Sequence, residues 1–392
     1  MAGPIRVILW QGAVPTYRAP VWRMLSEHPD IDLLLLRGQT PDQRSVEVPG
    51  VRVEPVRLVR LPLGLDMYPS QWVRPRVGEA DVAIVPWSSR SLSALWCISR
   101  CRRLGIGVVA WGHGAGKQSS SWRDRLRNAI GRRADVTMVY SRGVADQLTA
   151  GGGFDPARVR VAANSLDTRL ARAARSAWSD ESRLNAFRVE QRLDGPVILY
   201  VSRLIPSKRP ELVVEVLAAL RERHRGLKAV LIGDGPQREI VMRTADRLGV
   251  GDAVLLPGAL FEEEQLAPYF CAADVFCYPR SIGLSLQHAF AYGLPVVTDD
   301  DAVSHGPEVE ALVHEKNGLI YQRGDVGAMI EAVDRLLCDP ALRARCREGA
   351  MEVIDPANPE SFTAERMIEG FVGAIRAAYA SAASRRGLRS GA

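Results

Sequence analysis

The amino-acid sequence predicts an α/β protein with two doubly wound parallel sheets, one in each half of the chain. Short, almost uninterrupted apolar runs, such as residues 5–10 and 197–201, have the composition of buried parallel strands, and helical segments follow them. This alternation occurs on both sides of residues 168–194, a polar, charged and helical stretch with no strand pattern. The length of 392 residues also exceeds what one hydrophobic core usually holds.

The elements of the first half follow one another in a regular order. Strand patterns occur at residues 5–10, 31–36, 51–61, 82–86, 108–111, 136–140 and 159–163. Helical segments lie between them and begin at Pro20 and at residues 92, 119 and 143. Residues 38–50 and 62–78 are polar or proline-rich and are predicted to be loops.

The second half repeats the alternation. Strands are predicted at residues 196–201, 227–233, 254–256, 274–278 and 296–298, and helices at 211–222, 240–248, 266–272, 284–292, 308–314, 325–338 and 361–382. The domains expected are a first domain over residues 1–170, a linker over 171–194 and a second domain over 195–365. Residues 366–392 are predicted to form a C-terminal helix, which can cross back to the first domain, and a tail that frays over the last ten residues.

Composition places the chain among ordinary soluble proteins, with 47% hydrophobic and 24% charged residues. The sequence contains no uninterrupted run of about 18 apolar residues, so no membrane-spanning helix is predicted. The N-terminus leads directly into a strand and not into a signal peptide, so a cytoplasmic location is expected. The six cysteines form no C-x-x-C pair and have no metal-ligand spacing with histidine, which predicts reduced, mostly packed thiols.

Positive charge is concentrated in the first half of the chain. Residues 1–177 contain 26 Lys and Arg against 14 Asp and Glu, and the remainder contains 25 against 31, so +12 and −6 add to the net charge of +6. The basic half suggests an anionic membrane surface or an acidic acceptor as a partner, and a solvated arginine-rich surface is the alternative. The same alternatives hold for residues 122–133, which have the pattern of a basic amphipathic helix.

Residues 279–293, between two predicted strands, have the pattern of a short helix bounded by glycines. Gly283 precedes this helix and Gly293 ends it. A helix that begins at a glycine turn after a parallel strand presents free N–H groups to an anion, most often phosphate. Arg280 stands at the entrance of the turn, and His288 lies one helical turn inside. An ordinary strand–helix–strand unit is the alternative interpretation.

Cationic and imidazole side chains follow other predicted strands. Arg203 and Lys208 come after the strand at 197–201, where two fixed cations can neutralise a diphosphate leaving group. His113 lies between two glycines after the strand at 108–111 and is a candidate for catalysis or sugar binding, because small neighbours let a ligand approach the ring. A solvated basic loop and a packed histidine are the respective alternatives.

From residue 159 to residue 325, the order of these motifs resembles that of the family-4 retaining glycosyltransferases, which have the GT-B fold. The matching stretches are residues 161–168, 203–208, 231–236, 256–258, 266–279, 283–297, 307–309 and 317–318. The first half resembles the family more loosely, through residues 15–20 and His113. The resemblance implies two Rossmann-like domains that face each other across a cleft, with the nucleotide-sugar donor on the second and the acceptor on the first.

The resemblance also implies roles for individual residues. His113, Arg203 and Lys208 are expected to act in catalysis, and Tyr17 and Arg18 to bind the acceptor. The expected donor-binding residues are Gly12, Gly233, Gly258, Arg280, Gly283, Leu284, Ser285, His288 and Glu308. The family signature has two glutamates eight residues apart, which contact the donor sugar and the ribose. Arg280 and His288 occupy these positions here, which indicates a variant branch in which Glu308 is the remaining nearby acid.

Together these features predict a glycosyltransferase that moves a sugar from a nucleotide-sugar to an acceptor hydroxyl, in cell-surface polysaccharide or glycolipid assembly. The resemblance implies that the transfer occurs with retention. The leaving diphosphate can serve as the base, and side-chain cations can neutralise it, so neither a cofactor nor a metal is expected. The expected partners are the nucleotide-sugar, a saccharide or lipid-linked acceptor and the inner face of an anionic membrane, but no nucleic acid. A nucleotide-sugar epimerase of the same fold and a non-catalytic nucleotide-sugar-binding subunit are the alternatives.

Overall fold

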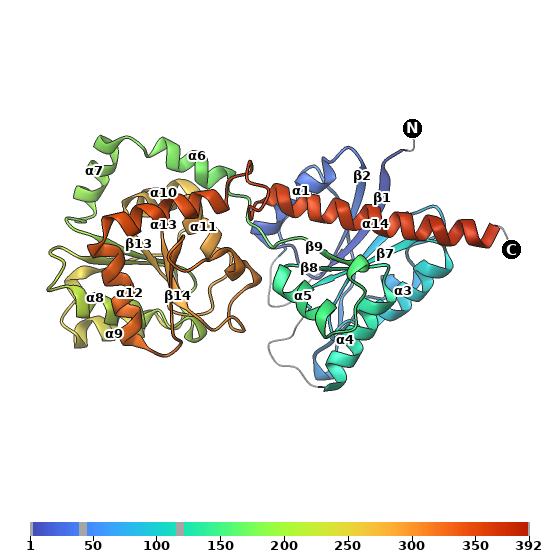
Figure 1. The fold of residues 1–392 in the computed structure, drawn as a ribbon, viewed down its shortest axis with the longest axis horizontal. Helices are drawn as coiled ribbons and strands as arrows, with labels where there is room; N and C mark the ends of the chain where they lie inside the picture. Colours follow the sequence, from blue (N-terminus) through green and yellow to red (C-terminus); the bar gives the residue numbers. More distant parts are fainter. Residues whose placement is uncertain (1–2, 39–44, 115–120, 391–392) are drawn as a thin grey trace. The chain divides into compact units, whose positions relative to one another are not determined.

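The computed structural model describes residues 3–38, 45–114 and 121–390, which form two α/β units (Figure 1). The N-terminal unit contains residues 1–167 together with 364–392, and the C-terminal unit contains residues 168–363. Each unit has its own parallel sheet and its own hydrophobic core. The predicted α/β class, with one doubly wound sheet in each half, is confirmed.

The N-terminal unit has a parallel sheet of seven strands in the order β3-β2-β1-β6-β7-β8-β9. The strands are β1 (Ile5–Gln11), β2 (Ile31–Arg37), β3 (Arg52–Pro55), β6 (Val82–Pro86), β7 (Gly107–Gly112), β8 (Val136–Val139) and β9 (Val159–Val161). A separate antiparallel pair is formed by β4 (Val59–Leu61) and β5 (Leu65–Met67). The single strand predicted at residues 51–61 is therefore divided, because its second part pairs with β5 instead of continuing beside β2.

Both faces of this sheet are buried, which explains the uninterrupted apolar runs in its strands. Val7 and Leu9 of β1 belong to one core, and Ile8 and Trp10 belong to the other, because successive side chains of a strand point to opposite faces. The first core contains residues of the helices α1 (Ala19–Ser26) and α14 (Ala364–Ser390), and the second contains residues of α3 (Ser93–Arg103) and α4 (Ser121–Arg133). The unit also contains the helices α2 (Ser70–Val73) and α5 (Arg142–Ala150).

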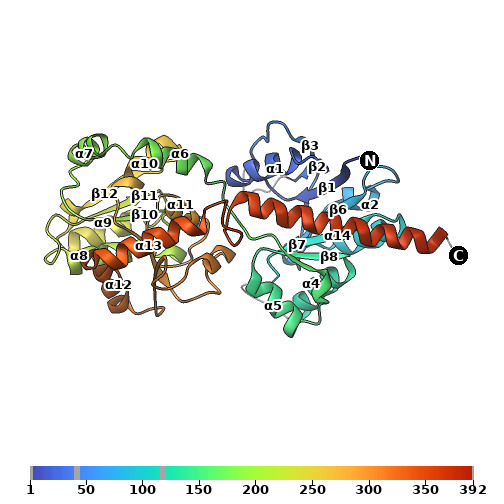
Figure 2. The same ribbon diagram turned by 45° about the horizontal axis from the view of Figure 1, so that its top comes forward.

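The last helix, α14 (Ala364–Ser390), belongs to the N-terminal unit and crosses its sheet over β6, β7 and β8 (Figure 2). Gly107 permits the close crossing at β7, because a Cβ atom there would lie 2.4 Å from the carbonyl oxygen of Ala378. Trp22 and Trp111 make edge-on contacts with Phe371 of α14, with ring centroids 5.3 and 5.1 Å apart. The helix thereby completes the core on this face of the sheet.

The end of α14 differs from the frayed tail predicted for the last ten residues, since it is helical through Ser390. Its anchor is the buried carboxylate of Asp135, which accepts hydrogen bonds from Arg385 Nη2 at 3.0 Å and Ser381 Oγ at 3.2 Å. The backbone N–H of Val108 donates to the same carboxylate at 2.9 Å. Because Arg385 and Asp135 are 250 residues apart, the sequence of the terminal segment does not reveal this pairing.

The C-terminal unit has a parallel sheet of six strands in the order β12-β11-β10-β13-β14-β15. The strands are β10 (Val197–Val201), β11 (Lys228–Ile232), β12 (Val254–Gly258), β13 (Val275–Cys277), β14 (Val296–Asp299) and β15 (Gly318–Tyr321). The direction of strand order reverses between β10 and β13. Such a switch point leaves a crevice at the carboxyl ends of the strands, where ligands bind in doubly wound sheets.

The helices of the C-terminal unit form two groups, one against each face of the sheet (Figure 1). One group consists of α8 (Glu211–Leu220), α9 (Arg238–Arg247) and α12 (Val326–Cys338). The other consists of α6 (Arg169–Ala177), α7 (Glu181–Glu190), α10 (Glu263–Ala272), α11 (Ser285–Ala291) and α13 (Pro340–Val353). In the ranges that the structure describes, no helix has both the length and the apolar character needed to cross a membrane.

Residues 171–194, which the sequence analysis treats as a linker, are folded into the C-terminal unit as α6 and α7. Aromatic contacts hold them, since Phe187 lies edge-on to Trp178 at 5.7 Å and to Tyr269 of α10 at 5.0 Å. The segment has a charged, mostly exposed surface with few apolar anchors, and such a composition is also typical of linkers. Two further elements of the C-terminal unit were not predicted, the short strand β15 and the helix α13, which follows α12 after the capping residue Asp339. In the N-terminal unit, β5 and α2 lie within residues 62–78, which were predicted to be a loop.

Candidate active site

The candidate donor-binding residues of the C-terminal unit follow the carboxyl ends of its strands. Arg203 and Lys208 follow β10, Gly233 follows β11, and Gly258 ends β12. The segment from Arg280 to Ser285 follows β13, and Glu308 comes after β14. Because parallel strands end at one edge of a sheet, the fold brings these residues to the same edge.

Lys208 is held over the turn that follows β13. It ends the 3-10 helix Pro206–Lys208, and its Nζ atom donates a hydrogen bond to the carbonyl oxygen of Ser281 at 3.3 Å and another to the hydroxyl of Tyr278. The ammonium group lies 4.8 Å from the centroid of the Tyr278 ring, within the range of a cation–π contact. The cation is therefore fixed at the switch point between β10 and β13.

Tyr278 is the buried group around which the site is arranged. Its ring stacks on Tyr200 at 5.0 Å, and its hydroxyl donates to Ser202 Oγ at 2.8 Å. Burial raises the pKa of Tyr278 to about 12, although hydrogen bonds with Ser202 and Ser285 and the charge of Arg203 act in the opposite direction. A neutral phenol thus connects Ser285, at the start of α11, with the cationic loop after β10.

Arg203 is exposed in this loop, and its backbone carbonyl accepts a hydrogen bond from the Tyr200 hydroxyl at 3.5 Å. The loop lies against Gly233, which has a φ of 144° and whose Cβ, if present, would lie 1.8 Å from the carbonyl oxygen of Ser202. Only glycine fits this close approach. The N–H of Gly233 donates to the carbonyl of Gly258 at 2.8 Å, so the ends of β11 and β12 are joined.

The turn after β13 is held by a buried histidine that the sequence analysis did not include among the site residues. His305 Nδ1 accepts a hydrogen bond from the N–H of Ile282 at 3.0 Å, and Nε2 lies 2.9 Å from the carbonyl oxygen of Asp299. Since Nδ1 accepts, the ring carries its proton on Nε2. Ser281 in this turn has a φ of 57°, an uncommon value for a residue other than glycine. Such strain is concentrated at functional sites.

Glu308 is buried, with its side chain against Gly306 and Gly283. Arg280 lies elsewhere, in a small pocket of about 80 Å³ beside Asp299 and Tyr321. Burial raises the pKa of Tyr321, and the charge of Arg280 opposes this effect. Thus Glu308 lies against the glycine turn itself, whereas Arg280 lines a pocket together with Val326 at the start of α12.

The His288 ring lies against a carboxylate that the sequence did not predict. Its Nε2 atom lies 2.9 Å from Oε1 of Glu263, which is the first residue of α10. The hydroxyl of Tyr292 donates to the same oxygen, and the ring of Phe270 lies 4.5 Å from that of His288. A carboxylate from α10 therefore lies beside His288, at a position where the family resemblance leads us to expect a glutamate. Residues 262–264 are three glutamates in succession, and the sequence contains no signal that selects the second.

This pair predicts a pH-dependent contribution to stability. Burial raises the pKa of Glu263, but the hydrogen bond and charge of His288 and the hydroxyl of Tyr292 outweigh it and leave the pKa lowered. A carboxyl with a lowered pKa in the folded state stabilises the fold above its unfolded pKa of about 4.5, and this stabilisation is lost as the pH falls through the folded value. We expect Glu263→Gln to lower the free energy of unfolding by about 1.5–3 kcal/mol at pH 7, with a smaller difference below pH 4.5.

Urea unfolding at pH 7, 5 and 4 measures this effect. Glu264→Gln is the matched control, because Glu264 lies in the same first turn of α10 but is exposed. Equal loss of stability in both variants at every pH would show that the pair with His288 contributes nothing specific.

The N-terminal unit has a pocket of about 560 Å³ around His113. Gly12 and His113 line it, and the His113 ring lies 4.5 Å from the ring of Tyr140. The lining also includes three arginines and several aromatic side chains, among them Arg90, Arg123, Arg127, Trp10, Tyr68 and Trp87. The pocket therefore combines positive charge with flat apolar surfaces, a combination suited to an anionic saccharide.

The two residues expected to bind the acceptor differ in their exposure. Tyr17 is 40% exposed, whereas Arg18 is only 4% exposed. The guanidinium of Arg18 donates to Asn164 Oδ1 and lies 3.0 Å from Met367 Sδ of α14. Arg18 thus makes its contacts inside the N-terminal unit.

Two doubly wound units with these strand-end loops define the GT-B class, and solved structures agree. An Anabaena protein, HepE, solved in complex with UDP, superposes with a TM-score of 0.69 over 95% of this chain and 99% of its own, at 16% identity. A glycosyltransferase from Rickettsia africae gives a TM-score of 0.71 over 96% and 99%, at 12% identity. A protein of Listeria monocytogenes described as a putative UDP-N-acetylglucosamine 2-epimerase gives 0.61 over 97% and 98%, at 14% identity.

Sequence comparisons give the family. Residues 22–170 match the model of Glycosyltransferase Family 4, and residues 182–353 match that of Glycosyl transferases group 1. The GDP-mannose-dependent alpha-(1-6)-phosphatidylinositol monomannoside mannosyltransferase of Mycolicibacterium smegmatis is 30% identical over 72% of this chain and 75% of its own length. The D-inositol 3-phosphate glycosyltransferase of Acidothermus cellulolyticus is 31% identical over 65% and 57%. The chain therefore belongs to the glycosyltransferase family that these two models and the mycolicibacterial relative represent.

Proposed function

We propose that this glycosyltransferase moves a sugar from a nucleotide-sugar donor to the hydroxyl of an anionic saccharide or phosphorylated polyol, with retention at the anomeric carbon. The observation that carries the proposal is the arrangement of Lys208 and Arg203 around Tyr278 at the switch point of the C-terminal sheet. Fixed cations there stabilise the negative charge that develops on the departing diphosphate.

The chemistry assigned to the site needs no protein nucleophile. The departing diphosphate accepts the proton of the acceptor hydroxyl, and the new bond forms on the face from which the diphosphate leaves, so the configuration is retained. Lys208 and Arg203 hold the diphosphate, and the proposal assigns its neutralisation to them without a metal. The Glu263–His288 pair supports a variant branch, because it returns a carboxylate to the neighbourhood of a replaced signature glutamate.

The pocket around His113 supports an anionic acceptor. Arg90, Arg123 and Arg127 supply positive charge, and the aromatic residues supply surfaces on which sugar rings stack. The two relatives named above act on a phosphatidylinositol mannoside and on an inositol phosphate by their descriptions, and both acceptors carry phosphate. A lipid-carried acceptor would bring the exposed Trp122 and Arg125 of α4 against an anionic membrane on the cytoplasmic side, consistent with a role in glycolipid or cell-surface polysaccharide assembly.

The test is to incubate the protein with UDP-, GDP- and TDP-sugars as donors, first without an acceptor and then with one. The acceptors are inositol phosphate and phosphatidylinositol mannoside, and the lipid is supplied either free or in anionic vesicles. Acceptor-dependent release of nucleoside diphosphate is expected, with an α-linked product from an α-linked donor by NMR. Conversion of the donor without acceptor would identify an epimerase instead. Nucleotide binding without turnover on any acceptor would identify a non-catalytic subunit, and an inverted product would overturn retention.

A further inference from the structure

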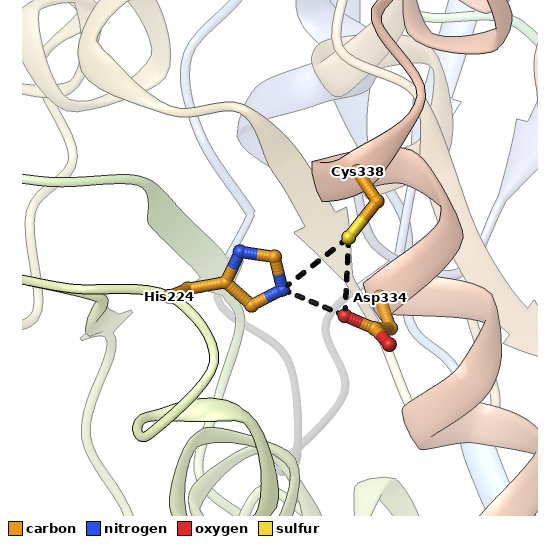
Figure 3. A group of neighbouring side chains, drawn as sticks. All are labelled: His224, Asp334 and Cys338. Carbon is orange, nitrogen blue, oxygen red and sulfur yellow. Dashed lines mark hydrogen bonds and ion pairs between the residues drawn. The ribbon is translucent and has the colours of Figure 1, made fainter.

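Among the described residues, one group of metal-ligating side chains lies together outside the candidate active site (Figure 3). It consists of His224, in the turn after α8, and of Asp334 and Cys338, one helical turn apart on α12. Their ligand atoms all lie within 4.8 Å of one another. Although the sequence separates His224 from Cys338 by 114 residues, the packing of α8 against α12 brings them together.

The three ligand atoms converge on one point. Cys338 Sγ lies 3.9 Å from His224 Nε2 and 3.6 Å from Asp334 Oδ1, and the nitrogen and oxygen are 2.6 Å apart. In a nucleophilic triad the thiol and the carboxylate contact different ring nitrogens, whereas here both face Nε2. The arrangement is therefore unsuited to a proton relay and suited to a shared ion.

Two of the three separations fit a tetrahedral zinc ion. Bonds of about 2.0–2.3 Å to N, O and S in tetrahedral geometry place pairs of ligand atoms about 3.3–3.6 Å apart. Both separations from Cys338 Sγ are within a few tenths of an ångström of these values. Only the contact between His224 and Asp334 would have to open, by about 0.7 Å, as the ion replaces their hydrogen bond.

Arg223 pairs with one carboxylate oxygen of Asp334, and the other oxygen can bind the ion. Arg223 Nη1 lies 3.0 Å from Oδ2 of Asp334, whereas Oδ1 faces the imidazole and the thiol. Arg223 is 69% exposed, so water weakens its repulsion of a cation. This ion pair therefore orients the carboxylate with Oδ1 toward the imidazole and the thiol.

The group lies at the edge of the sheet opposite the donor-binding loops. α12 follows the carboxyl end of β15 and runs back for 13 residues to Cys338, a length of about 20 Å. α8 likewise begins after the loop that contains Lys208 and leads to His224. Metal binding here would join two helices without contacting the donor-binding loops.

We propose that His224, Asp334 and Cys338 bind one Zn²⁺ ion, with water as the fourth ligand, and that the ion ties the end of α8 to α12. Thiolate, imidazole and carboxylate are the ligand types that Zn²⁺ takes in proteins. Cys338 binds as the thiolate and releases its proton to solvent. The site is independent of the proposed transfer reaction.

The test uses the full chain, freed of metal by chelation under reducing conditions and then titrated with Zn²⁺ and with Co²⁺ as a spectroscopic probe. The wild type is expected to retain one Zn²⁺ per chain, to show a thiolate-to-cobalt charge-transfer band, and to melt at a higher temperature with Zn²⁺. Cys338→Ser and His224→Gln are each expected to weaken Zn²⁺ binding at least about 100-fold, since even ligand-orienting partners contribute 10–100-fold.

Cys271→Ser and His314→Gln are the matched controls, because they remove the same ligand types from other parts of the C-terminal unit. Both should bind Zn²⁺ like the wild type. The proposal is overturned if the wild type retains no stoichiometric Zn²⁺, if Co²⁺ gives no charge-transfer band, or if Cys338→Ser and His224→Gln keep the wild-type affinity. Circular dichroism verifies that each variant is folded, and because the two substitutions lie on different elements, a folding failure of one leaves the other as the test.

Discussion

Removing either cation at the β10–β13 switch point is expected to lower kcat/KM about 10²- to 10³-fold, the effect of removing one donor from a preorganised anion site. The changes are Arg203→Ala and Lys208→Met. Methionine replaces the aliphatic part of the lysine side chain but carries no charge, so the loss reports mainly the missing ammonium group. The loss should fall mainly on kcat, because the diphosphate carries its largest charge at the transition state.

Steady-state kinetics with the donor identified by the panel measure this effect. Arg247→Ala is the control, since Arg247 is exposed at the end of α9, on the opposite edge of the same sheet. Thermal unfolding confirms that the variants are folded. Rates within a few-fold of wild type for both Arg203→Ala and Lys208→Met would remove the diphosphate assignment.

The second large effect is expected on stability, at the end of α14. The side chain of Asp135 is only 2% exposed. Arg385→Ala removes the closest cationic partner of this buried carboxylate. Breaking a buried ion pair from one side costs about 3–5 kcal/mol. The free energy of unfolding of the N-terminal unit should fall by about this amount, because Asp135 immediately precedes β8.

Arg376→Ala is the matched control on the same helix. Arg376 pairs with Asp30, but the two side chains are 58% and 47% exposed, so this pair contributes at most about 1 kcal/mol. Tryptophan fluorescence during urea unfolding follows the N-terminal unit, because seven of the eight tryptophans, all except Trp178, precede residue 168. Similar losses for Arg385→Ala and Arg376→Ala would contradict the role of the buried pair.

Local patterns are sufficient to predict most of the two sheets. A parallel strand covered on both faces needs an uninterrupted apolar run, and residues 197–201 show one clearly. The sequence predicts a linker at residues 171–194 because two charged helices that need only a few aromatic contacts have the composition of a solvated segment. It predicts a frayed tail at the end of α14 because the anchor of this segment, Asp135, lies far away in the sequence.

The same distinction holds for the candidate site. The location of the donor-binding residues at the carboxyl ends of the strands could be predicted. Residues that follow parallel strands lie at the same edge of the sheet, and this does not depend on how their side chains are oriented. Its side-chain partners could not be predicted, because they depend on how helices pack against each other. Glu263 meets His288 only through the contact of α10 with α11, and Arg18 is buried only because α14 returns to the N-terminal unit.

The return of α14 has a consequence for the order in which the chain can mature during synthesis. The C-terminal unit is one continuous segment, residues 168–363, so it can fold as soon as that segment leaves the ribosome. The N-terminal unit is made first but lacks one wall of its core, including Phe371 against Trp22 and Trp111, until residues 364–390 are translated. The half that is synthesised first is therefore completed last, and a nascent chain cut short before α14 exposes an apolar sheet face to chaperones and proteases.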